Sequence, residues 1–264
     1  MWLEIKKILM RRQYWFTMIL LTGSVILDYL TVCKEYYGAP LSQVRSAYHC
    51  TVLKNDVPNI ASVPYNVLFP ILACIMCSDI YYEEHKLGIS NFLYTRSDKR
   101  ADLLHKLFAV FIVSFLSFFA PLLLNLGLSV ITFPIQGHYA SYTTYLSLVN
   151  LEPDRMLSYL EAYHPYWNIL CFILIRCLIA SLIAVFSYSI SLVFTTSRYF
   201  VLLSGFIYYI LYSNLTNLIP NDLLNTILIS VNGYGSIWAI FLFSLFTIFL
   251  IVLCYQAGKR KETI

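Results

Sequence analysis

One stretch of the chain concentrates the residues that could make polar contacts with a partner. Residues 81–106 carry charges of both signs around a short apolar strip formed by Ile89, Phe92 and Leu93. Positions three and four apart share one face of a helix, so these three side chains would lie together. An apolar strip with a charged rim suits docking to a soluble protein. Two interpretations stay open here, a short docking helix and a solvated connection between helices.

Three further acidic or basic residues lie within long apolar runs. Asp28 and Arg176 fall several residues inside such runs, at depths that differ by roughly 6 Å if both runs are helical. A lone charge in an apolar layer costs about 2.5–3.5 kcal/mol on insertion scales, so we predict that both face the protein interior and pair or line a polar path. The alternative is that each side chain reaches the surface separately. Asp79 lies near the end of its run, and we expect it to need no partner.

Catalytic motifs are absent from the sequence. No phosphate-binding Gly-x-x-x-x-Gly-Lys-Ser/Thr loop occurs, and the five His residues lack metal-ligand spacing. The Cys74-Ile-Met-Cys77 spacing has no second Cys pair or His partner to complete a metal site. We therefore predict no catalytic residues, no metal and no cofactor in this chain. Cys33 and Cys50 flank one polar segment, and a disulfide between them stays open.

The elements that must position these residues follow from an uneven lack of charge. Apolar residues make up 59% of the chain and charged residues 12%, against about 25% charged in a typical soluble domain. Lys, Arg, Asp and Glu are all missing from 107–151 and from 223–258. Such runs exceed the roughly 20 apolar residues that span a bilayer. The chain is predicted to be an all-α integral membrane protein.

We predict one domain, 1–264, with six transmembrane helices at about 14–33, 63–81, 107–133, 167–195, 199–217 and 234–257. Residues 1–13 would form an amphipathic interfacial helix, because Trp2, Ile5, Ile8 and Leu9 share one face; a plain basic flank is the alternative. Residues 134–166 would form an extracellular loop. The apolar stretch within 221–232 is too short to cross, so we expect a re-entrant half-helix before the last span.

The basic residues decide the orientation. With both termini in the cytosol, thirteen of the 18 Lys and Arg residues lie on the inner side and four on the outer side, while Arg176 lies within a span. Cytosolic loops of membrane proteins carry the excess of Lys and Arg. The net charge of +4 is thus a signal of topology and gives no indication of nucleic-acid binding.

The stretch around 82–107 also follows a known pattern. It carries, in order, Glu83 or Glu84, Gly88, the run Phe92-Leu93-Tyr94-Thr95-Arg96, Arg100, and Lys106 at the start of the third predicted span. This order resembles the type-2 ABC transporter permease family, the membrane subunits of bacterial exporters. The layout of an interfacial helix, six spans and a broken segment before the last span is similar over the whole chain.

The resemblance implies a half-transporter in the plasma membrane of a bacterium. A second permease copy or a related permease would complete the pathway, and a separate ABC ATPase subunit would bind ATP and Mg. Residues 83–104 would be the cytosolic coupling loop that docks in a groove of that ATPase. In that arrangement Glu83, Glu84, Arg96 and Arg100 would make polar contacts, and Phe92 and Leu93 would form the apolar anchor.

The sequence does not identify the transported substrate. Related exporters move peptides, lipids or drugs, and the abundant aromatic residues suit an amphipathic substrate as well as they suit packing and interfacial belts. Two other classes stay open. One is a secondary transporter or channel that works without an ATPase, and the other is a membrane protein that binds a peptide for immunity or sensing.

Overall fold

The computed structural model describes residues 2–40, 43–54, 60–88, 99–135, 157, 160, 163–194, 197–217 and 237–261. Within these residues the regular elements are all helical. They are, in chain order, α1 (Trp2–Leu9), α2 (Arg12–Glu35), the 3-10 turn η2 (Ile60–Ser62), α3 (Val63–Asn66), α4 (Phe69–Cys77), α5 (Ile80–Lys86), α7 (Lys99–Thr132), α10 (Pro165–Val193), α11 (Arg198–Asn217) and α13 (Ile237–Lys261).

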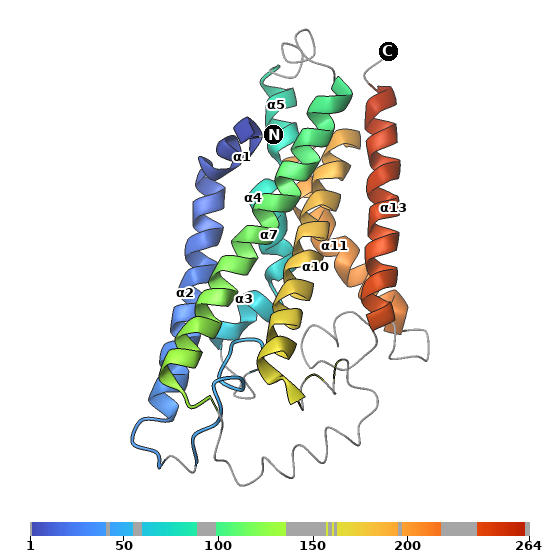
Figure 1. Ribbon diagram of the computed structural model, residues 1–264. Coiled ribbons are helices and arrows are strands. Elements are labelled where there is room, and N and C mark those ends of the chain that lie inside the picture. Colours follow the sequence, from blue (N-terminus) through green and yellow to red (C-terminus); the bar gives the residue numbers. More distant parts are fainter. Residues whose placement is uncertain are drawn as a thin grey trace.

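Five of these helices, α2, α7, α10, α11 and α13, are long and apolar enough to cross a membrane. They run roughly side by side along one bundle (Figure 1). This agrees with the predicted all-α membrane protein, and the five helices overlap the first, third, fourth, fifth and sixth predicted spans. Helix α1 covers most of the predicted interfacial segment. The expected half-helix at 221–232 and nearly all of the 134–166 loop lie outside the described residues.

The second predicted span, 63–81, is not one long helix. It forms α3, α4 and α5, which follow one another along the bundle (Figure 1). Pro64 and Pro70 each sit in the first turn of a new helix, where the missing N–H costs nothing. Pro70 cannot donate to a carbonyl four residues earlier, so α3 cannot continue into α4. The prediction of a long second span is therefore wrong: within the described residues five helices are long enough to cross a membrane, and a broken segment stands in place of the second span.

The broken segment is tolerated because protein surrounds it. Residues of α4 such as Phe69, Ala73 and Met76 are fully buried, and the helix packs against α2, α10 and α11. Non-helical backbone at membrane depth is stable only where it is shielded from lipid. Helix α10 lies at the centre of the same core, packed against α4, α7, α11 and α13, while α2, α11 and α13 turn large apolar side chains outward.

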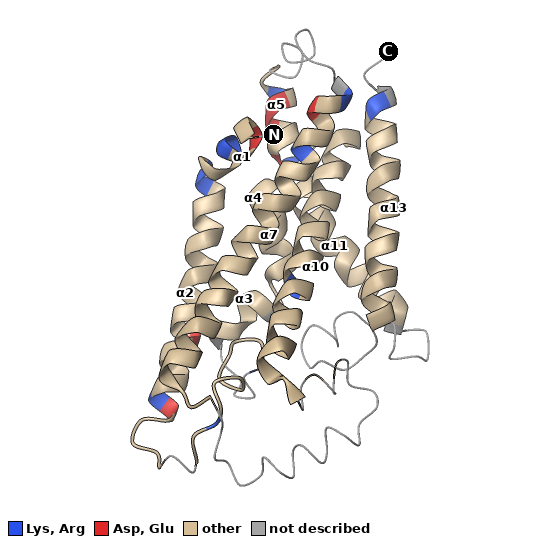
Figure 2. Cartoon of the chain, in the orientation of Figure 1, with Lys and Arg blue, Asp and Glu red and all other residues tan. Residues whose placement is uncertain are grey.

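Charge is concentrated at one end of the bundle. Figure 2 shows most of the Lys and Arg of the described residues at the end where both chain termini lie. We refer to this as the basic end. Helix α1 begins there, and α13 finishes there. The shared position of the termini is what the predicted topology requires, although the side of the membrane that each end faces stays a prediction.

Residues 43–54 pack into the opposite end of the bundle. Tyr48 and Val52 are 2% exposed, so this polar-looking segment is packed into the bundle. The Val52 N–H donates to Asn125 Oδ1 at 2.9 Å, and the Tyr48 hydroxyl donates to Asn168 Oδ1 at 3.2 Å. Cys33 and Cys50 lie in the same apolar cluster as free thiols, and burial raises the pKa of Cys50 to about 12.

Helices α4 and α11 approach each other closely at a glycine. A Cβ placed on Gly205 would lie 2.5 Å from Cys74 Sγ and 3.1 Å from the carbonyl oxygen of Ile183 in α10. Both distances are shorter than van der Waals contact. Gly205 therefore allows α11 to pack directly on the broken segment and the central helix.

We predict that Gly205→Ala lowers the free energy of unfolding by about 1–3 kcal/mol, because the new methyl group overpacks the α4–α11 contact. Gly127→Ala is the matched control, since a Cβ there meets nothing within 4 Å. Stability would be measured by titrating the detergent-solubilised protein with sodium dodecyl sulfate. Equal unfolding curves for the two variants would contradict the close packing at Gly205.

Candidate functional site

The most densely charged site in the described residues surrounds the buried carboxylate of Asp79, just before α5. Its side chain is fully buried, and Arg11 Nη1 donates to Asp79 Oδ1 at 2.7 Å. The other oxygen, Oδ2, accepts from Arg198 Nε at 2.9 Å and Nη2 at 2.8 Å, and from Gln13 Nε2 at 3.1 Å. Two arginines and an amide thus hold one carboxylate at the basic end.

Glu83 completes this group from the next turn of α5. Its carboxylate pairs with Arg11 Nη2 and lies 3.3 Å from Arg198 Nη2. Residues four apart lie on one helical face, and Asp79 precedes the first turn of α5 by one position. The two acids therefore face the two arginines together, in an alternating arrangement of opposite charges.

The arginines come from the points where two other helices begin. Arg11 has an extended backbone (φ −76°, ψ 140°) and separates α1 from α2, while Arg198 is the first residue of α11. Burial by itself lowers the pKa of Arg11, but the attraction of Asp79 and the hydrogen bonds to Asp79 and Glu83 outweigh it and leave the pKa raised. Arg11 is thus held as a cation that ties α5 to the α1–α2 junction.

A second group lies on the other side of α5, around Lys106 of α7. Lys106 is 2% exposed, and its Nζ lies 2.6 Å from Glu84 Oε2 and 2.8 Å from Asp102 Oδ2. Lys7 of α1 reaches the other Glu84 oxygen at 3.5 Å and Glu4 at 2.8 Å. Burial lowers the pKa of Lys7, but the hydrogen bond and charge of Glu4 outweigh it and leave the pKa raised.

Together the two groups form what we call the ion network: Glu4, Lys7, Arg11, Asp79, Glu83, Glu84, Asp102, Lys106 and Arg198. It joins α5 to α1, to the start of α2, to α7 and to α11. Taking one partner from a buried ion pair costs about 3–5 kcal/mol, because the other charge is then buried alone. The network can therefore carry a displacement of α5 to the helices around it.

The structure brings together part of the predicted coupling site. Glu83, Glu84 and Lys106 belong to the ion network. Gly88 has a φ of +71° and ends α5, a backbone conformation that glycine adopts without strain. Arg100 is exposed at the start of α7, and its carbonyl accepts from the Tyr255 hydroxyl of α13 at 3.4 Å.

The rest of the predicted coupling site lies outside the described residues. This applies to Phe92, Leu93 and Arg96, and to Ile89 of the apolar strip. The described chain stops at Gly88 and resumes at Lys99, so both flanks of the loop start from elements held by the ion network.

The expectation that Asp79 needs no partner is wrong. The missed signal is the spacing of Asp79 and Glu83, which places two acids on one face at the membrane edge. Such a pair needs basic partners, and the sequence offers Arg11 and Arg198 at the same predicted depth. Which of the many basic residues at that end would approach could not be read from the sequence.

Asp28 and Arg176 are both buried, as predicted, and their pairing stays a prediction. The Arg176 guanidinium lies 4.6 Å from the ring centre of Phe69 in α4, a cation–π contact. Phe69 in turn packs edge-to-face on Tyr209 of α11, with ring centres 5.2 Å apart. Arg176 thus contributes to the contact of the central helix with the broken segment.

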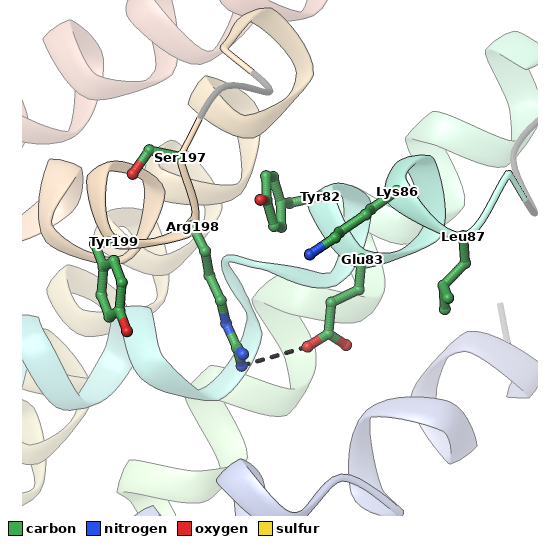
Figure 3. Close-up of a pocket in the computed structure, with 7 residues that line it drawn as sticks. All are labelled: Tyr82, Glu83, Lys86, Leu87, Ser197, Arg198 and Tyr199. Atoms are coloured by element: carbon green, nitrogen blue, oxygen red, sulfur yellow. Dashed lines mark ion pairs between the residues drawn. The ribbon is translucent and has the colours of Figure 1, made fainter.

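Beside the ion network lies an open hollow of about 600 Å³. Its lining comes from α5 and from the start of α11: Tyr82, Glu83, Lys86, Leu87, Ser197, Arg198 and Tyr199. Figure 3 shows the Lys86 amine extending from α5 into the space between α5 and the start of α11, and the Arg198 guanidinium reaching Glu83 from the other side. Across the described part of the chain, no group of three or more His, Cys, Asp or Glu is arranged to hold a metal ion.

Comparison with known proteins finds a relative of this chain. It is 26% identical over 196 residues to YybM of Bacillus subtilis (strain 168), a protein described as uncharacterized; the match covers 74% of this chain and 73% of YybM. No family model matches the chain, and no solved structure matches it.

We predict that Asp79→Asn lowers the free energy of unfolding by about 3–5 kcal/mol, because Arg11 and Arg198 lose the charge that holds them. The control is Glu35→Gln, which removes a negative charge from an exposed residue at the other end of α2. Unfolding in sodium dodecyl sulfate measures both variants. If Asp79→Asn is no less stable than Glu35→Gln, the ion network does not hold the basic end together.

Proposed function

We propose that the chain is the membrane-spanning permease subunit of an ABC exporter, which moves an amphipathic substrate such as a peptide, lipid or drug out of the cell with ATP hydrolysed by a separate subunit. The observation that supports the proposal is the ion network, whose members lie on both sides of residues 89–98, the middle of the proposed coupling loop. Glu83 and Glu84 of α5 precede this loop, and Asp102 and Lys106 of α7 follow it. Ion pairs thus tie each flank of the proposed coupling loop to other helices.

Through these ion pairs, a movement of the proposed coupling loop would be passed on to other helices. In the proposed function, an ATPase that binds residues 83–104 pushes or pulls α5 when its own subunits close. Arg11 and Arg198 link α5 to the beginnings of α2 and α11, so those helices move with it. Rigid-body movement of packed helices between two arrangements is the usual form of such gating. The chain itself hydrolyses nothing in this scheme.

The same proposal fixes the topology. The basic end faces the cytosol, as the excess of Lys and Arg there favours. The segment α3–α5 serves as the sixth crossing in broken form. A second copy or a related permease completes the pathway in the plasma membrane. The outward apolar faces of α2, α11 and α13 then contact lipid or that second permease.

The proposal predicts that Phe92→Asp and Arg96→Glu each abolish co-purification of the chain with its ATPase, because they remove the apolar anchor and reverse a contact charge. The complex would be isolated from native membranes through a tag on this chain. Lys6→Glu is the matched control, since Lys6 is exposed on α1 at the same end and lies outside the ion network. Retention of the ATPase by both loop variants would overturn the assignment of the coupling loop.

A secondary transporter is the alternative that the buried charges favour, because Asp28 and Arg176 lie inside the bundle. Intramembrane charges commonly mark ion or substrate pathways. The two functions differ in their energy source. Purified chain in proteoliposomes, with an ion gradient and no ATPase, should show no transport if the exporter proposal is correct. Gradient-driven transport that Arg176→Gln abolishes would establish the alternative.

A further inference from the structure

The hollow at the basic end sits at the depth where a membrane span begins. Its lining includes Arg198 and Tyr199, the first residues of α11, and the membrane-compatible stretch of that helix starts at Arg198. Tyr199 is 77% exposed. An exposed Tyr beside basic residues is typical of the membrane interface, where aromatic rings lie at the level of lipid headgroups.

The lining carries one net positive charge. Lys86 and Arg198 are basic and Glu83 is acidic, while Arg11 and Asp79 behind them compensate each other. Arg198 uses Nε and Nη2 for its contacts with Asp79 and Glu83, and Nη1 takes no part in them. Within the described residues Lys86 forms no ion pair, and Figure 3 shows its amine extending into the hollow. Two donors thus remain for an anion.

The start of α11 adds further donors. The Phe200 N–H lies 3.4 Å from Ser197 Oγ, which places Ser197 at the N-cap of a 20-residue helix. The N-terminus of such a helix carries a partial positive charge and favours phosphate groups. Tyr82 and Tyr199 bring hydroxyl groups from the two sides of the hollow. Charge, helix dipole and hydroxyl donors therefore favour the same class of ligand.

We propose that this hollow binds the phosphodiester headgroup of an anionic membrane lipid in the inner leaflet. The inference rests on the proposed function for its orientation, with the basic end in the cytosol. A phosphodiester carries one negative charge, which matches the net charge of the lining, whereas a free phosphate near neutral pH carries closer to two. The volume of about 600 Å³ suits a headgroup, and the exposed Tyr199 at the start of α11 suits the interface beside it. Anionic lipids are enriched in the cytoplasmic leaflet.

The bound lipid would act at the point where α5 and α11 are already joined by Arg198. Its phosphate would bridge Lys86 and Arg198 across the hollow and bring a further contact between the two helices. The lipid composition of the membrane would then influence how firmly α5 follows α11.

The test is native mass spectrometry of the purified full-length protein, titrated with phosphatidylglycerol or with phosphatidylcholine of the same chain length. Phosphatidylglycerol should bind more tightly than phosphatidylcholine, and Lys86→Gln should weaken phosphatidylglycerol binding about fivefold, the share of one basic residue near an anionic surface. Lys6→Gln, at an exposed position on α1, should leave binding unchanged. Lys86 is exposed, so its replacement leaves the fold intact.

Inorganic phosphate distinguishes the source of the anion. If it displaces phosphatidylglycerol, or if Lys86→Gln binds phosphatidylglycerol like the unmodified chain, the lipid site is overturned. Loss of ATPase co-purification in Lys86→Gln with unchanged lipid binding would assign the hollow to a protein partner and would also overturn it. The titration contains no ATPase, so Lys86-dependent lipid binding would stand even if the exporter proposal failed.

Discussion

The fully buried carboxylate of Asp79 is the constraint on which the basic end of the molecule depends. A carboxylate removed from water needs opposite charge and hydrogen bonds within reach. Arg11, Arg198 and Gln13 supply them, and each enters from a place where a helix starts. The beginnings of α2 and α11 are therefore fixed against α5 by one side chain. Glu83 and the Lys106 group extend the same principle to α1 and α7.

The break in the second apolar run places Asp79 just before a new helix, where Arg11 and Arg198 reach its carboxylate. A single helix through 63–81 would bury its polar Ser78 and Asp79 along a continuous helical surface. At the break after Cys77 the Ser78 hydroxyl donates to the Cys74 carbonyl at 2.6 Å, and Asp79 precedes a new helix. The cost of the interruption is small because α2, α10 and α11 enclose α4, and Gly205 lets α11 approach it closely.

The sequence predicts the long helices well because a run of 20 or more residues without charge is rare outside membrane spans. The family pattern singles out Glu83, Glu84 and Lys106, which the structure places in the ion network, while their role in coupling stays a prediction. The sequence misses the broken span, since Pro64 and Pro70 are compatible with a kinked helix as well as with a new start. It also misses Arg11 and Arg198, which meet Asp79 across 68 and 119 residues of chain. Such contacts depend on how the helices pack, and hydropathy gives no information on that packing.

The two ends of the bundle are held by different chemistry, and the difference bears on how it could open. At the basic end, ion pairs with buried members join five helices, and separating one pair leaves a charge in a poorly solvated place. At the other end, residues 43–54 are held to α7 and α10 by neutral hydrogen bonds from Val52 and Tyr48, and the Lys54 ammonium lies 4.8 Å from the ring centre of Phe172 in α10. A neutral hydrogen bond contributes about 1 kcal/mol net, so several can be exchanged for water at modest cost. In the proposed exporter, the basic end would be the rigid end that receives the movement, and the opposite end would be the weaker end that yields to it.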